Sequence, residues 1–70
     1  MSTMGERIRR LRTAAGMTQE SLARAVNKTT GTVGKWERDV DTPSIASLRS
    51  LAQVLKTTAD YIIGAPPPPP

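Results

Sequence analysis

The sequence contains no cysteine, no histidine and no phenylalanine. Without cysteine, the chain can form no disulfide bond, no thiolate metal site and no thiol nucleophile. The lack of histidine removes the commonest general base and metal ligand. Only six acidic residues remain, and they are scattered along the chain. We therefore expect no enzymatic activity, no metal site and no cofactor.

Long apolar segments are also missing. No run is long enough to span a membrane, and the N-terminal MSTMGERIRR has no apolar segment of the signal-peptide kind. These absences predict a cytoplasmic protein without a membrane partner.

The chain has 70 residues and ends in five prolines. We expect one small domain over residues 1–64 and a polyproline tail over residues 65–70. A domain of this size buries only about 60% of the surface of its unfolded chain. The tail suits either a linker to an oligomerising domain or the end of a small protein, and the sequence does not decide between them.

Basic residues outnumber acidic ones. Ten lysines and arginines give a formal net charge of +4 and an isoelectric point near 10.4. This balance is typical of nucleic-acid-binding domains. Small basic domains also bind acidic proteins or simply remain in solution, so charge alone leaves the partner open.

Residues 18–38, TQESLARAVNKTTGTVGKWER, predict two short helices joined by a tight turn. We expect the helices over residues 19–26 and 30–38, because apolar side chains recur on one face of each at helical spacing: Leu22, Ala23 and Val26 in the first, Val33 and Trp36 in the second. Asn27 lies at the corner, where a sharp reversal of the chain favours a residue with positive φ.

With these residues, the stretch resembles the helix-turn-helix family of lambda-type phage repressors and Cro proteins. The matching positions are that family's glutamine, small residue, turn glycine and two core apolar residues, here Gln19, Ala23, Asn27, Val33 and Trp36. The resemblance covers residues 5–64 and implies an all-α, compact five-helix domain. It departs at Asn27, where the family prefers glycine. It also departs at Asp39 and Val40, which weakens the case for a phosphate contact from that loop.

The resemblance implies a sequence-specific transcriptional regulator that binds double-stranded operator DNA as a homodimer and represses by covering a promoter. Base readout is implied for Thr29, Thr30, Gly31 and Lys35. Phosphate contacts are implied for Thr18, Gln19, Lys28, Thr32, Arg38 and the helix end at Ser44. We expect the exposed side of residues 30–38 to include Gly34 as well. A weak surface helix that tolerates glycine is the other interpretation of this segment.

Several arginines lie along the expected first helix. This helix runs from about Met4 to Ala15 and ends at Gly16. Arg7 and Arg9 suit either a solvated face or a DNA contact. Arg12 lies beside the apolar stripe, and the resemblance implies a structural ion pair between Arg12 and Glu37. Thr3 and Glu6 match a capping box at the start of this helix.

Two further helices are expected after the loop that contains Pro43. The first, over residues 45–55, has the clearest apolar face of the chain: Ile45, Leu48, Leu51, Ala52 and Leu55. The second follows the N-cap Thr58 and ends at Gly64. The resemblance implies a dimer contact on this last helix, formed by Tyr61, Ile62 and Ile63.

Two rival functions remain open from the sequence. An antitoxin-type protein of this fold would bind a protein partner, as well as DNA, through the surface from Tyr61 to Ile63. An RNA-binding module would display aromatic side chains on an open surface, and Trp36 is the candidate for such stacking. Its spacing from Val33 favours a place in the core instead.

Overall fold

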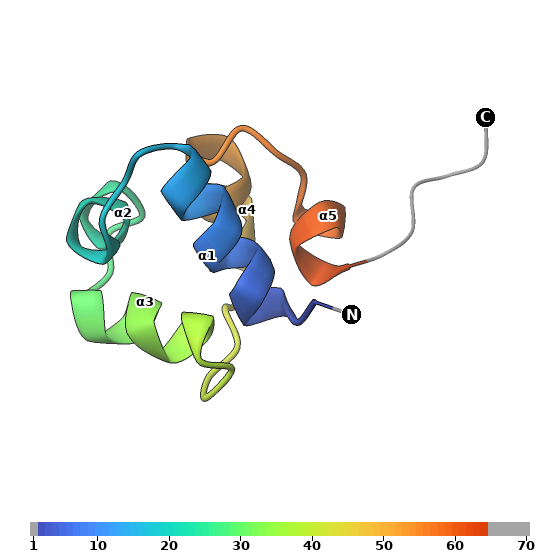
Figure 1. The fold of residues 1–70 in the computed structure, drawn as a ribbon, viewed down its shortest axis with the longest axis horizontal. Coiled ribbons are helices and arrows are strands. Elements are labelled where there is room, and N and C mark those ends of the chain that lie inside the picture. Colours follow the sequence, from blue (N-terminus) through green and yellow to red (C-terminus); the bar gives the residue numbers. More distant parts are fainter. Residues whose placement is uncertain (1, 65–70) are drawn as a thin grey trace.

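The computed structural model describes residues 2–64, which form five helices and no strand (Figure 1). The helices are α1 (Met4–Ala14), α2 (Gln19–Ala25), α3 (Thr30–Glu37), α4 (Ile45–Val54) and α5 (Ala59–Ile63). The expected all-α, five-helix architecture is confirmed, and each predicted boundary lies within one residue of the observed one. None of these helices is long and apolar enough to cross a bilayer. The expected polyproline tail, residues 65–70, lies outside the described residues.

Every helix begins after a serine or threonine whose side-chain oxygen accepts the backbone N–H three residues later. The five N-caps are Thr3, Thr18, Thr29, Ser44 and Thr58. Such a cap satisfies one of the free N–H groups of the first turn. The reciprocal capping box, however, forms between Thr18 and Ser21 rather than between Thr3 and Glu6. A serine or threonine N-cap therefore marks the start of each helix.

The turns between helices use left-handed backbone conformations. Asn27 has a φ of 59°, as its place at the corner predicts, and Gly16 and Gly64 have φ values of 71° and 96°. Asp39 and Lys56 adopt φ values of 58° and 55°, which the sequence did not indicate. Asparagine and aspartate tolerate this conformation better than most non-glycine residues.

The core forms where α3 packs against α1 and α2, and α4 against α5 (Figure 1). Its fully buried side chains come from all five helices: Ile8, Leu22, Val33, Leu51 and Ile62. Trp36 is only 3% exposed, so it belongs to the core and is no stacking platform for a base. Ile45 was expected in the core but is 72% exposed. It is the first residue of α4.

The last helix corrects one residue of the expected dimer contact. Ile62 has no exposed surface and belongs to the core, whereas Tyr61 and Ile63 on either side of it are about half exposed. Consecutive residues of a helix point in different directions, so one short helix cannot present all three to a partner. Ile62 is therefore unavailable to a second chain.

Candidate nucleic-acid interface

One side of α3 is fixed in the core and the other is open to solvent. Val33 and Trp36 anchor the buried side, while Gly31, Lys35 and Arg38 are exposed. Figure 1 shows α3 along one edge of the molecule, with α2 beside its N-terminal end. Gly34 was expected on the exposed side, but it is buried: a Cβ there would lie 3.1 Å from Arg38 Nη1 and 3.8 Å from Gln19 Oε1.

A buried carboxylate holds α3 in place. Glu37 Oε2 accepts from Arg12 Nε at 2.6 Å and Glu37 Oε1 accepts from Arg12 Nη2 at 3.1 Å. Arg12 Nη1 donates to the Met17 carbonyl at 2.9 Å. The hydrogen bond to Glu37 raises the pKa of Arg12 above its ordinary value. The structure thus brings Arg12 and Glu37 together in the ion pair that the family resemblance implied.

Gln19 belongs to the same network. Its Nε2 donates to Glu37 Oε1 at 3.1 Å, so the side chain turns toward α3. This amide was expected at a DNA phosphate. Because its nitrogen donates to Glu37, Gln19 helps to fix α2 on α3. Its expected contact with a DNA phosphate stays a prediction.

Three threonines proposed for DNA contact already use their hydroxyl groups within the chain. Thr18 Oγ1 accepts from the Ser21 N–H at 3.0 Å, and Thr29 Oγ1 accepts from the Thr32 N–H at 3.2 Å. The hydroxyls of Thr29 and Thr32 also lie 2.9 Å apart. These contacts hold the starts of α2 and α3 in place. The polar groups of Lys35 and Thr30 are less engaged in hydrogen bonds among the described residues.

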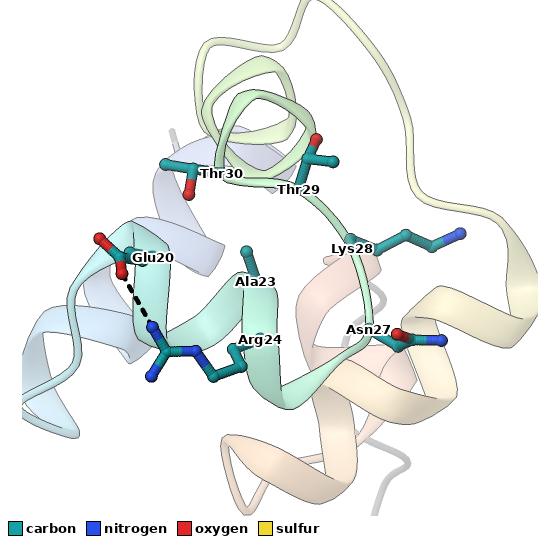
Figure 2. Close-up of a pocket in the computed structure, with 7 residues that line it drawn as sticks. All are labelled: Glu20, Ala23, Arg24, Asn27, Lys28, Thr29 and Thr30. Carbon is teal, nitrogen blue, oxygen red and sulfur yellow. Dashed lines mark hydrogen bonds and ion pairs between the residues drawn. The ribbon is translucent and has the colours of Figure 1, made fainter.

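A hollow of about 440 Å³ lies between α2 and the start of α3 (Figure 2). Three proposed DNA-binding residues line it, Lys28, Thr29 and Thr30. An exposed ion pair borders it, with Arg24 Nη2 2.8 Å from Glu20 Oε1. Figure 2 shows the Lys28 side chain extending away from that pair. The lysine charge is therefore free of an internal carboxylate partner on this side.

A second hollow, of about 260 Å³, separates the turn from the start of α4. Lys28 lines it together with Ser44 and Ser47. The N-terminus of α4 carries the partial positive charge of a helix end. The structure thus brings Lys28 and Ser44, both proposed for phosphate contact, to one hollow.

Arg7 has a structural role that spacing along the sequence did not reveal. Its Nε donates to the Ile62 carbonyl at 2.9 Å and its Nη2 to the Ile63 carbonyl at 2.8 Å. Its Nη1 donates to the Ser2 carbonyl at 2.6 Å. Both earlier readings, a solvated face and a DNA contact, are wrong for Arg7, because this guanidinium caps the C-terminal end of α5. The two acceptors on α5 lie more than fifty residues away along the chain, so no local sequence pattern predicts them.

Asp39 holds the start of α1 against the end of α3. Its Oδ2 accepts from Thr3 Oγ1 at 2.6 Å and its Oδ1 accepts from the Gly5 N–H at 2.9 Å. These hydrogen bonds, with the nearby charge of Arg7, lower the pKa of Asp39 below its ordinary value. A carboxylate near a helix N-terminus is also favoured by the helix dipole. This contact gives Asp39 a structural role at the junction of α1 and α3.

No group of three histidine, cysteine, aspartate or glutamate side chains suited to a metal ion occurs in the described part of the chain. The exposed face of α3 and the two hollows beside Lys28 form the candidate site.

Comparison with known proteins covers nearly all of the described chain. Residues 8–62 match the sequence profile of a family described as helix-turn-helix. The chain is also 40% identical, over 63 residues, to the uncharacterized HTH-type transcriptional regulator YazB of Bacillus subtilis (strain 168). That alignment covers 90% of this chain and 88% of YazB.

Several solved structures have the same arrangement of helices. The P22 c2 repressor, crystallised with a synthetic operator, matches with a TM-score of 0.90 at 29% identity, covering 94% of this chain and 100% of that one. The restriction-modification controller protein C.AhdI from Aeromonas hydrophila matches with a TM-score of 0.79 at 34% identity, covering 84% and 89%. The biofilm regulator SinR, in complex with DNA, matches with a TM-score of 0.80 at 26% identity, covering 86% and 97%.

Proposed function

Because this chain belongs to the helix-turn-helix family, we propose that it is a sequence-specific transcriptional regulator that binds double-stranded DNA. In this proposal α3 enters the major groove and α2 lies across it. The protein acts in the cytoplasm, has no catalytic activity, and represses transcription by occupying an operator that overlaps a promoter. The P22 c2 repressor, a structural relative, is a repressor bound to an operator. This relative supports repression rather than activation.

The exposed face of α3 is the observation that carries the proposal. A helix of eight residues is seldom stable alone, yet α3 is held by buried Val33 and Trp36 and by the Glu37 ion pair. Its outer face carries Lys35, which is exposed to solvent. A rigid helix that exposes a basic side chain suits the major groove, which admits one α-helix.

Phosphate contacts are assigned to the groups around this helix. Lys28 lies between the two hollows beside the turn, and Arg38 follows the last turn of α3. The starts of α2 and α4, after Thr18 and Ser44, offer free backbone N–H groups. Such contacts fix the position of a protein on DNA and carry no sequence information themselves.

A second copy of the chain completes the proposed complex. Tyr61 and Ile63 are about half exposed on α5, and α2 and α5 lie at opposite ends of the domain (Figure 1). Contact between two copies through α5 leaves each α3 free for one half-site. We do not favour the antitoxin alternative, since YazB is described as a transcriptional regulator and the P22 c2 protein as a repressor.

Selection of bound sequences from a randomised DNA duplex library tests the proposal. We expect the wild-type protein to enrich a two-fold symmetric sequence, and Lys35→Ala to enrich a sequence that is relaxed at one base pair of each half-site. Lys56→Ala is the matched control, because Lys56 is exposed in the turn between α4 and α5. Failure of the wild-type protein to enrich any sequence contradicts the proposal.

A further inference from the structure

Three glycines lie within helices, and packing explains only two of them. A Cβ at Gly5 would lie 2.5 Å from the Trp36 carbonyl oxygen and 2.6 Å from that of Glu37. A Cβ at Gly34 would lie 3.1 Å from Arg38 Nη1. The close approach of α1 to α3 requires the first glycine, and the side chains that cover α3 favour the second.

Gly31 is different, because the fold leaves room for a side chain there. Apart from its two chain neighbours and the backbone of its own helix, a Cβ built on Gly31 would have one neighbour within 4 Å, Thr29 Oγ1 at 3.9 Å, which is an ordinary van der Waals contact. Its backbone is helical, with no positive φ. Glycine in a helix is destabilising relative to alanine, because it loses more conformational freedom on folding. Nothing within the described chain offsets this cost.

The position of Gly31 on the helix indicates why glycine occurs there. Gly31 and Lys35 are four residues apart in α3, so they are neighbours on one face, and both are exposed. The hydroxyls of Thr29 and Thr32 contact each other, and Thr29 Oγ1 also accepts from the Thr32 N–H. At Gly31 the exposed face of α3 therefore has no side chain, and Lys35 lies one helical turn further along.

We propose that Gly31 determines specificity through its missing side chain, which lets the edge of a base pair approach the backbone of α3. This inference rests on the proposed function. With no Cβ at this position, α3 lies deep enough in the major groove for the Lys35 ammonium to reach a base edge. Any side chain at position 31 holds the helix away from the bases and weakens that contact. Phosphate contacts made by longer side chains, such as Lys28, are less sensitive to this displacement.

The test compares Gly31→Ala and Gly31→Leu with the wild-type protein and with Gln53→Ala. Gln53 is an exposed residue near the C-terminal end of α4, on the side of that helix away from Ser44. Thermal unfolding of each variant comes first. Equilibrium binding is then measured to the duplex that the wild-type protein enriches and to an unrelated duplex of equal length.

We expect Gly31→Ala to raise the Tm, by up to about 8 °C, and to lower affinity for the enriched duplex about tenfold or more. Gly31→Leu lowers that affinity further, whereas binding of every variant to the unrelated duplex stays at the wild-type level. Gln53→Ala leaves both affinities unchanged. A variant that is more stable and yet binds its site less tightly is the signature of a constraint imposed by DNA.

Three results overturn the inference, and they are distinguishable. If Gly31→Ala binds the enriched duplex as tightly as the wild-type protein, no close approach occurs there. If its Tm falls, the fold itself requires glycine. If affinity falls equally on both duplexes, the neighbour of Gly31 is the sugar–phosphate backbone. Should the wild-type protein enrich no sequence at all, the proposed function fails, and the inference fails with it.

Discussion

The guanidinium of Arg12 donates two hydrogen bonds to the carboxylate of Glu37, joining α1 to the end of α3 at distances of 2.6 and 3.1 Å. The side chains are 12% and 3% exposed, and Gln19 adds a third hydrogen bond from α2. Burial makes such a pair a weak source of net stability, since both charges lose their hydration. Its geometry nevertheless fixes three helices in one arrangement, which determines how α3 is presented to solvent.

Removing one partner of this ion pair is expected to destabilise the domain. Arg12→Met leaves the Glu37 carboxylate buried without its cation, which we expect to lower the free energy of unfolding by about 3 to 5 kcal/mol. Urea denaturation monitored by helical circular dichroism measures the change. Glu20→Gln is the control, because its ion pair with Arg24 is exposed and contributes at most about 1 kcal/mol. Equal, small effects from both variants contradict the structural role of the buried pair.

Stability in acid is expected to depend on Asp39. The pKa of this carboxylate is lower in the folded state than its ordinary value of 3.8, so its charge contributes stability above that value. The contribution is lost as the pH falls from about 4 through the folded-state pKa. The Tm difference between the wild-type protein and Asp39→Asn is therefore constant near neutral pH and shrinks below about pH 4.

The matched control for Asp39 is Asp41→Asn. Asp41 accepts a hydrogen bond only from the N–H of its neighbour Thr42 among the described residues, so it does not join two helices. We expect the Tm of Asp41→Asn to follow the wild-type curve over the whole pH range. A Tm difference for Asp39→Asn that is the same in acid and at neutral pH shows that the charge of Asp39 does not stabilise the start of α1.

Neighbouring isoleucines on α5 are expected to behave oppositely. Ile62 is fully buried and Ile63 is 48% exposed. Ile62→Ala should therefore cost about 2 to 5 kcal/mol of folding free energy, whereas Ile63→Lys should change stability by at most about 0.5 kcal/mol. Analytical ultracentrifugation and binding to a two-half-site duplex then test the contact between copies. We expect Ile63→Lys to bind the second half-site less tightly; unchanged assembly shows that Ile63 lies outside any such contact.

Local sequence features predicted the helix boundaries well, because their physical causes are local. A threonine such as Thr29 begins a helix by accepting an N–H three residues later, and Asn27 tolerates the left-handed conformation of the turn. The burial of Val33 and Trp36 followed from their spacing alone. The resemblance to lambda-type repressors, drawn from residues 18–38, is confirmed by the family profile and by the P22 c2 repressor.

Contacts between distant segments were the main source of error. Arg7 and Asp39 meet backbone groups of helices far along the chain, and no periodicity encodes those partners. Gly34 was expected in solvent from its place in the helix, but it is buried because the side chains of Arg38 and Gln19 cover it. The assignment of individual residues to bases and phosphates remains a prediction.

The binding of Lys35→Ala to single-base variants of the enriched duplex, at two salt concentrations, tests the central claim most directly. Lys28→Ala is the comparison, since a phosphate contact lowers the salt slope by about one unit without altering base preference. We expect Lys35→Ala to lose about 1 to 3 kcal/mol of discrimination at one guanine of each half-site and to retain its preference at every other position. An equal loss of affinity for Lys35→Ala across all single-base variants contradicts base readout by Lys35.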